Sequence, residues 1–468
     1  MNKMLLMTVA VCCVVLTSLA DVTRVGVDFT RAEGLVKPLD GVCNSPLPFT
    51  QGKSNVRELT EMKELGSPFV RLHDTGGPYG RNTLVDIPNV FRDMDADEND
   101  PANYDFAFTD AYLEQLVKAG CTPYYRLGVT IENYYRIKAY RIHPPKDFAK
   151  YARVCEHVVR HYTKGWANGF RWKMPYWEVW CEPENRQLWL GTRQQFFDLY
   201  AAIAREIKAH HPDVRIGGYG ACRFENFENL DVNSDDCMSN WLGWFEEFCD
   251  YVTAEKTKAP LDFFSWHLYR PFPNRHVWHA KDVRERLDRH GLKDVESHLT
   301  EWNIGGKFGI RAQHSVTGAV YVASGLCAFQ KAPIDLATLY DAGSGNWGVV
   351  FDRFGKPNTV YYSLQKFRFM RDLGTSYAVR DDEENLVYAL AAGDGKDKAV
   401  LLTNYSFTDT RTVRLDLVGA KMSDFTLYRL DEAHPKFPKI GPAGDSNELV
   451  LPPLTAIYLT TEDQHERK

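Results

Sequence analysis

The chain of 468 residues lacks the short motifs that mark several common kinds of functional site. No two cysteines have C-x-x-C spacing, so neither a zinc knuckle nor a thioredoxin-type site is expected. A G-x-S-x-G elbow is also missing, which argues against serine-based hydrolysis. There are no long runs of one charge, and 56 basic and 62 acidic residues give a net charge of −6. We therefore expect no nucleic-acid partner and no attraction to an anionic membrane surface.

Two patterns that could hold a metal ion are incomplete. His157 and His161 have the i,i+4 spacing of helical ligands, but they lack the H-E-x-x-H order and a third ligand. A solvated or capping histidine pair is the better interpretation. Residues 93–100 are rich in carboxylates but lack the glycine and the final glutamate of an EF-hand, which favours an exposed acidic loop. The sequence thus predicts no metal site.

The N-terminal segment has the layout of a cleavable signal peptide. Lys3 supplies a positive charge, Met4–Leu16 is almost wholly apolar, and Ser18 and Ala20 are small residues before the cleavage point. The apolar run is short for a membrane span. We therefore expect a secreted or periplasmic protein with no membrane insertion after signal cleavage. Export permits disulfides among the cysteines that follow Cys13, but their spacing does not pair them.

From Pro38 onward, short apolar segments alternate with longer amphipathic ones, which is the pattern of β/α units. Eight segments are expected to be strands: Leu39–Val42, Phe69–Leu72, Thr122–Leu127, Trp177–Trp180, Val214–Gly217, Phe263–His267, Ser297–Thr300 and Leu336–Tyr340. Eight such strands over about 330 residues predict a (β/α)8 TIM barrel. A doubly wound sheet is the competing arrangement. It would need a phosphate-binding glycine loop after its first strand, and residues 41–46 do not form one.

Beyond Gly374 the pattern changes to short strands joined by turns, which predicts a small antiparallel β-sandwich. The expected fold class is therefore α/β, a TIM barrel with a C-terminal sandwich. The chain is expected to divide into a signal peptide at 1–20, an N-terminal strand at 21–37 that pairs with the sandwich, a catalytic barrel at 38–373 and the sandwich at 374–468.

Two glutamates stand at the ends of expected strands, where a TIM barrel places its active site. Glu182 follows the fourth expected strand, and Glu301 follows the seventh. Glycoside hydrolysis requires two facing carboxylates, one to protonate the leaving oxygen and one to attack or to activate water. Nearby aromatic residues are expected to raise a carboxyl pKa, so that one group stays protonated near neutral pH. Glu178 lies inside its strand and is expected to pair with a buried arginine such as Arg71.

The segment Trp177–Asn185 reads WEVWCEPEN and resembles the WEVWNEPN motif of glycoside hydrolase family 39, the family of β-xylosidases and α-L-iduronidase. The similarity recurs in chain order at Arg71-Leu72-His73, Asp262–Tyr269 and Thr300–Asn303. It extends over roughly residues 38–372 and includes the order of a barrel followed by a sandwich.

The resemblance also implies roles for individual side chains. Glu182 would be the acid/base and Glu301 the nucleophile of a retaining double-displacement mechanism. His267 and Tyr269 would line the sugar subsite near the nucleophile, with His73 on the opposite wall. The motifs and the other strand ends supply the remaining candidate substrate contacts: Asn44, Cys181, Asn185, Trp302, Tyr340, Asp341 and Trp347.

Cys181 departs from the family pattern, which has Asn directly before the acid/base glutamate. That Asn would hydrogen-bond the substrate's 2-hydroxyl, whereas a thiol is a weak donor and a weak acceptor. The substrate could present a different group there, Asn44 or Asn185 could supply the contact, or activity could be weak. A tolerated substitution in an ordinary enzyme is the fourth alternative. Our hypothesis is that Cys181 marks an unusual glycone.

Two functions stay open at this point. One is a secreted retaining glycosidase of oligo- or polysaccharides, β-xylosidase-like and exo-acting if loops close the cleft, or endo-acting if the cleft is open. The other is a carbohydrate-binding protein derived from such an enzyme. Both have a carbohydrate as partner, and the oligomeric state is not determined. No organic cofactor is expected, because acid/base and nucleophilic work by carboxylates needs none.

Overall fold

A computed structural model describes residues 22–48, 56–73, 85–129, 142–222, 241–305, 309–343, 348–352 and 354–462. The expected signal peptide at 1–20 lies outside these residues. Within the described ranges, no helix is both long enough and apolar enough to cross a membrane.

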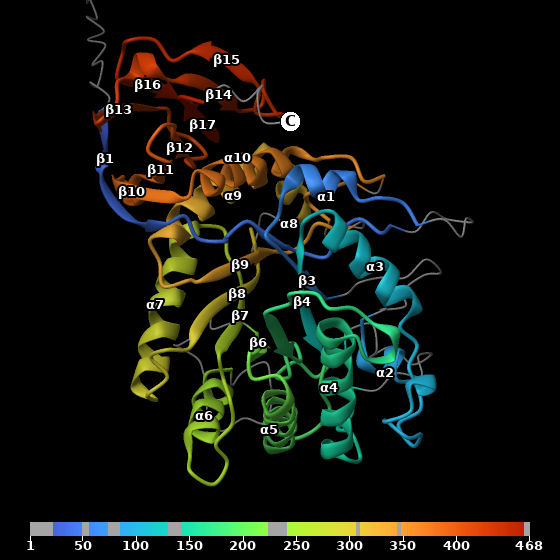
Figure 1. Cartoon of the computed structure of the whole chain (residues 1–468). Helices are drawn as coiled ribbons and strands as arrows, with labels where there is room; N and C mark the ends of the chain where they lie inside the picture. The colour runs from blue at the N-terminus through green and yellow to red at the C-terminus, as the bar shows by residue number, and fades with distance from the viewer. Residues whose placement is uncertain are drawn as a thin grey trace, which may run out of the picture.

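Eight parallel strands close into a barrel, with β2 paired to both β3 and β9. Most of these strands are labelled in the lower part of Figure 1. The strands are β2 (Gly41–Cys43), β3 (Phe69–Leu72), β4 (Thr122–Leu127), β5 (Tyr176–Val179), β6 (Arg215–Ala221), β7 (Phe263–Tyr269), β8 (Glu296–Asn303) and β9 (Leu336–Leu339). Each overlaps its expected segment, and the barrel part of the predicted fold class is confirmed. β6, β7 and β8 extend further toward their carboxyl ends than expected, so several site residues lie on strands instead of loops.

Helices surround the barrel, and their ends carry local sequence signals. Thr192 and Gln195 form a reciprocal capping box at the start of α5, and Gly165, in the left-handed region at φ 79°, ends α4. The helices are α1 (Thr60–Leu65), α2 (Ile87–Val90), α3 (Ala107–Lys118), α4 (Phe148–Lys164), α5 (Arg193–His210), α6 (Trp241–Thr253), α7 (Pro273–Arg289), α8 (Gly309–Gln313), α9 (Val316–Gln330) and α10 (Thr359–Leu373).

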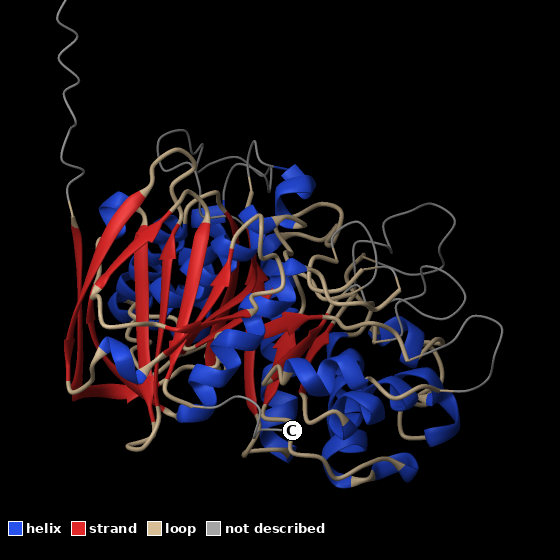
Figure 2. Cartoon of the chain, turned by 90° about the horizontal axis from the view of Figure 1, so that it is seen from above, coloured by secondary structure: helices blue, strands red, loops and turns tan. Residues whose placement is uncertain are grey.

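The C-terminal residues and the N-terminal β1 form a nine-stranded sheet in the order β15-β14-β17-β12-β11-β10-β1-β13-β16. Figure 2 shows strands in red as a broad layer beside the barrel. The strands of the sheet are β1 (Thr23–Leu35), β10 (Thr375–Arg380), β11 (Val387–Gly393), β12 (Lys398–Asn404), β13 (Arg411–Val418), β14 (Thr426–Leu430), β15 (Lys439–Pro442), β16 (Glu448–Leu451) and β17 (Thr455–Thr460). The N-terminal β1 lies between β10, to which it is antiparallel, and β13, to which it is parallel.

Both faces of the sheet are apolar, and each face packs against other parts of the protein, so the sheet forms one layer of a sandwich-like arrangement. On one face, Leu390 and Leu401 belong to the same core as the barrel, and α9 and α10 lie between the sheet and the barrel (Figure 1). On the other face, Val27, Val400 and Leu415 form a separate core within the sheet domain. α9 is buried on nearly all sides, as expected of a helix that is apolar all round. The predicted barrel and sandwich fold class is confirmed.

The histidine pair on α4 is buried, so the solvated alternative of our expectation was wrong, and Nδ1 of His161 lies 2.8 Å from the carbonyl oxygen of Trp166, just beyond the end of the helix. His157 is 5% exposed and His161 is 1% exposed. Nδ1 of His157 lies 3.0 Å from the hydroxyl of Tyr104, and Nε2 of His161 lies 3.0 Å from a carboxyl oxygen of Asp110. Both rings fill space between α4 and the segments packed on it, which explains their helical spacing without a metal.

Within the described residues, seven cysteines are buried and form no disulfide with one another. They occupy core positions, as short apolar side chains do. The disulfides that export would permit are therefore not formed among these seven. Cys237 lies outside the described residues.

Candidate active site

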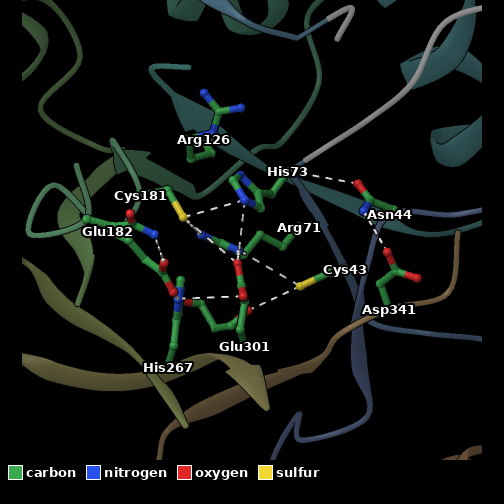
Figure 3. A network of polar contacts seen from close by, with 12 residues as sticks. Cys43, Asn44, Arg71, His73, Arg126, Cys181, Glu182, His267, Glu301 and Asp341 are labelled. Atoms are coloured by element: carbon green, nitrogen blue, oxygen red, sulfur yellow. Dashed lines mark hydrogen bonds and ion pairs between the residues drawn. The ribbon is translucent and has the colours of Figure 1, made fainter. Parts of the chain in front are cut away.

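The two predicted carboxylates come together at the carboxyl ends of the barrel strands (Figure 3). Glu182 lies three residues after the end of β5, Glu301 is on β8, and His267 of β7 lies between them. A ring nitrogen of His267 and one carboxyl oxygen from each glutamate all lie within 4.8 Å of one another. Glu301 is 5% exposed, and the side chain of Glu182 is 17% exposed. Closure of the barrel thus places side chains from distant parts of the chain in one partly desolvated cluster.

Arg71 on β3 connects Glu301 to the interior of the barrel. Its Nε donates to Glu178 at 2.7 Å, and its Nη1 donates to Oε1 of Glu301 at 2.8 Å. The predicted pairing of Glu178 with Arg71 is confirmed. The same guanidinium serves both carboxylates, and it holds Glu301 in one orientation.

The second oxygen of Glu301 is fixed as well. The hydroxyl of Tyr269, on β7, donates to Oε2 of Glu301 at 2.7 Å. Nδ1 of His267 lies 3.6 Å from the same oxygen. A guanidinium on one oxygen and a phenol on the other leave Glu301 little rotational freedom.

Glu182 lies in a strained stretch of main chain. Trp180 has φ of 68° and Glu182 has φ of 43°, both in the left-handed region that residues other than glycine seldom adopt. Such strain is concentrated at functional sites, because the surrounding structure must hold it in place. Nδ1 of His267 lies 2.9 Å from Oε1 of Glu182, and the amide of Asn185 donates to Oε2 at 3.4 Å.

The pKa of Glu182 differs from the sequence expectation. Burial pushes this pKa upward, but hydrogen bonds from His267 and Asn185 and the charge of His267 outweigh burial and lower it. The idea that desolvation raises the pKa of the acid was therefore wrong for the ligand-free site. The aromatic neighbours do not decide the balance, because a histidine and an amide reach the carboxylate directly.

Cys181 is fully buried beside the nucleophile candidate. Its Sγ lies 3.6 Å from Nε2 of His73 and 3.9 Å from Oε1 of Glu301, and it accepts from Nη2 of Arg71 at 3.5 Å. Burial raises the pKa of the thiol well above its ordinary value, although Arg71 opposes this. The thiol therefore stays protonated and contributes only weak hydrogen bonding.

Asn44, His73 and Asp341 form a further part of the cluster. His73 was expected on the wall opposite the nucleophile, but its Nε2 lies 3.7 Å from Oε1 of Glu301, so this placement was wrong. Asn44 follows β2, and its amide donates to Oδ2 of Asp341 at 3.3 Å, while its Oδ1 accepts from the main chain of His73 at 3.3 Å. Burial raises the pKa of Asp341 to about 7. Burial, followed by the charge of Arg71, lowers the pKa of His73 well below its ordinary value. The ring of Tyr340 lies 6.5 Å from that of His73 and 6.3 Å from that of Tyr269, measured between centroids.

One predicted substrate contact, Trp302, does not belong to this cluster. The ring of Trp302 is fully buried outside the barrel, against Tyr321 and Phe329, at centroid distances of 5.9 and 4.8 Å. Successive side chains of a strand point to opposite faces, so Glu301 inside the barrel requires Trp302 outside it. The expectation for Trp302 was wrong for this reason. Trp347 lies outside the described residues.

Sequence reasoning did not identify the glycine-rich strand β6 as part of the site. Gly220 has φ of 61°, and a Cβ there would meet Nε2 of His267 at 3.1 Å. The carbonyl of Gly220 accepts from the main-chain nitrogen of Glu182 at 3.0 Å. The Gly217-Gly218-Tyr219-Gly220 run was the available signal, since glycine inside a strand often marks the close approach of another group. Cys43, whose Sγ lies 4.0 Å from Nη1 of Arg71, was also missed.

The sequence of the barrel decides the relationship to known proteins. Residues 53–303, more than half of the chain, match the profile of the glycosyl hydrolases family 39. The chain belongs to this family. A β-xylosidase from Geobacillus stearothermophilus is 26% identical to this family 39 chain over 252 residues, which are 48% of the chain and 46% of that relative. The chain thus matches about half the length of the curated relative.

Solved structures show the same fold as this family 39 chain. A glucosidase from Croceicoccus marinus superposes with a TM-score of 0.74 at 22% identity, covering 94% of this chain and 98% of that one. A monomeric β-xylosidase from Caulobacter crescentus CB15 superposes with a TM-score of 0.67 at 17% identity, covering 94% and 99%. At these identities the likeness concerns the fold, which joins the barrel to the C-terminal sheet in the same way.

Proposed function

We propose that this chain is a retaining glycoside hydrolase in which Glu301 is the nucleophile and Glu182 the acid/base. The observation that carries the proposal is the closeness of their carboxyl oxygens, which lie within 4.8 Å across His267. Retaining enzymes hold their two carboxyl groups about 5–5.5 Å apart, whereas inverting enzymes need about 6.5–9.5 Å to admit a water molecule.

Each glutamate has surroundings that suit its proposed role. Glu301 is held by Arg71 and Tyr269, which orient it for attack on the anomeric carbon. In the first step, the proton of Glu182 passes to the leaving oxygen as the bond from Glu301 to the anomeric carbon forms. In the second step, Glu182 takes a proton from water, and that water releases the sugar from Glu301.

His267 affects the pH range in which Glu182 can act as the acid of the first step. Because it lowers the pKa of Glu182, His267 opposes the protonation that acid catalysis needs. Activity is therefore lost as the pH rises through the pKa of Glu182.

We further propose exo action on a β-xylosidase-like glycone, with a pentose or a related pyranoside in the site, in a secreted or periplasmic protein. Similarity to the β-xylosidase of Geobacillus stearothermophilus supports the sugar class, and the residues at 1–20 support export. An endo-acting glycanase is the alternative. End-product analysis decides between them: release of single sugars from chain ends fits exo action, and early release of mixed oligomers contradicts it.

The first experiment is hydrolysis of a panel of aryl glycosides and polysaccharides by the wild type beside Glu301→Gln. Activity in the wild type that disappears in the variant establishes the glycosidase and names its glycone. Proton NMR of the first sugar released then gives its anomeric form. Retention supports the double displacement, and inversion overturns it.

A carbohydrate-binding protein is the second candidate, because Cys181 stands where the family pattern has Asn. If the chain is a binding protein, the wild type and Glu301→Gln both bind sugar, and neither hydrolyses it. The ordered contacts to both oxygens of Glu301 favour the enzyme, since a binding protein has no need of them.

A further inference from the structure

We propose that His73, Cys181 and Glu301 form a binding site for a soft divalent cation of the Zn²⁺ class, and that its occupation blocks the nucleophile. Cation binding is independent of the proposed function. The inhibition rests on it, because inhibition requires that Glu301 act in catalysis.

The three ligand atoms already stand at distances close to those of a metal site. Nε2 of His73 and Sγ of Cys181 are 3.6 Å apart, Sγ and Oε1 of Glu301 are 3.9 Å apart, and Nε2 and Oε1 are 3.7 Å apart. Tetrahedral zinc with bonds of about 2.0–2.3 Å separates its ligand atoms by about 3.3–3.6 Å. Movements of a few tenths of an ångström bring all three into coordination.

The donor set selects the cation. Sulfur, imidazole nitrogen and carboxylate oxygen together suit Zn²⁺ and neighbouring soft cations, whereas Mg²⁺ and Ca²⁺ prefer oxygen alone. Three protein ligands leave the fourth position to water, as in many zinc sites. On binding, the proton of the Cys181 thiol passes to solvent and the sulfur–metal bond replaces it.

Surrounding groups orient two of the ligands, and the nearby carboxylates outnumber the nearby cations. Arg71 donates to both Glu301 and Cys181, and Tyr269 holds the second oxygen of Glu301. Among the described charges, Glu178 and Glu301 pair with Arg71, Glu182 lies beside Glu301, and Arg126, whose charge also reaches His73, is paired with Asp86. Carboxylates therefore outnumber guanidinium groups around the three ligand atoms, which favours a divalent cation.

A second triplet of possible ligands, Glu182, His267 and Glu301, shares one carboxylate with this site but contains no sulfur. The two triplets make different predictions. Only the first depends on the thiol, so the sulfur is the atom that the experiment must detect.

The experiment uses the full chain after removal of metal with a chelator. Zn²⁺ is titrated by calorimetry, and Co²⁺ is followed by absorbance, because a cobalt–thiolate bond has a near-ultraviolet charge-transfer band. We expect a single Zn²⁺ per chain, a thiolate band with Co²⁺, and affinity at least about 100-fold weaker in Cys181→Ala and His73→Asn. If hydrolysis is established, Zn²⁺ is expected to inhibit it, and the chelator to reverse the inhibition.

Two matched variants serve as controls. Cys155→Ala removes a buried thiol on α4, and His290→Asn removes a histidine that contacts Glu246 and Asp250 at 2.6 and 3.1 Å. Both are expected to bind Zn²⁺ as the wild type does.

Absence of Zn²⁺ binding, a Co²⁺ complex without the thiolate band, or unchanged binding in folded Cys181→Ala each overturns the proposal. The Co²⁺ spectrum of the wild type decides the matter even if a variant does not fold. Calorimetry needs no turnover, so a chain that binds Zn²⁺ but hydrolyses nothing contradicts the proposed function alone.

Discussion

Arg71 and Glu301 form an ion pair of 2.8 Å in which the guanidinium is fully buried and the carboxylate side chain is 7% exposed. The same arginine pairs with Glu178 at 2.7 Å, so one cation compensates two buried carboxylates. The candidate nucleophile is thus tied to the charge balance of the barrel interior, and stability and activity are coupled at this point.

Arg71→Met is expected to lower the free energy of unfolding by about 3–5 kcal/mol, because it leaves two buried carboxylates without the cation that pairs with them. Urea denaturation measures the loss. Arg24→Met is the control, because Arg24 pairs with Asp416 at the surface with 61% of its side chain exposed and should cost at most about 1 kcal/mol. Adding Glu178→Gln to Arg71→Met should recover part of the loss. Equal stability of Arg71→Met and Arg24→Met contradicts the shared-cation role.

His267→Ala is expected to move the basic limb of the pH dependence of kcat/KM to higher pH. The hydrogen bond and charge of His267 lower the pKa of Glu182, and their removal leaves burial to raise it. Asn185→Ala should shift the limb in the same direction but less, because its hydrogen bond to Glu182 is longer. The pH profile is the decisive readout, since a merely structural role would lower the rate without moving the limb. A basic limb that stays in place refutes the assignment of Glu182 as the acid.

Cys181→Asn is expected to change the glycone preference. An amide in this position can hydrogen-bond a 2-hydroxyl far better than the thiol does, and one such bond corresponds to roughly 10–100-fold in kcat/KM. The ratio of kcat/KM between xylosides and the best wild-type substrate measures the change. Cys249→Ser, a buried thiol on α6, is the control for loss of a sulfur elsewhere. If Cys181→Asn leaves both substrate profile and rate unchanged, Cys181 does not mark an unusual glycone.

Asp341→Asn is expected to stabilise the protein at pH 8 and to have little effect near pH 4. Burial raises the pKa of Asp341 to about 7 from an ordinary value of 3.8, so between these values the folded protein holds a proton that the unfolded chain has lost. Stability therefore falls as the pH rises through this range, by a few kcal/mol at most, and Asn removes that loss. Tm measured across the range tests this. Asp95→Asn, in the exposed acidic loop, should show no such dependence. A Tm difference that is constant with pH argues against a buried, titrating Asp341.

The barrel could be predicted from the sequence because its signals are local. Strands buried on both faces are short apolar runs, and the turns and helix caps between them use residues such as Gly165 and Thr192 whose preferences act within one turn. Parallel topology then places every strand's carboxyl end on one face, so Glu182 and Glu301 could be predicted to meet without knowledge of any distance. The resemblance to family 39 depended on the same strand ends.

The contacts within the site were decided by the tertiary structure alone. Each of these contacts joins residues from separate strands. Arg71 pairs with two carboxylates, and His267 lies between Glu182 and Glu301. Cys181 contacts His73 in the same way. Their distances depend on the register and closure of eight strands, which no local pattern specifies. The direction of Trp302 followed from the same register, since one residue along a strand turns a side chain from the inside of the barrel to the outside. The sequence by itself determined which chemical groups reach this face, and the closed barrel determined which of them touch.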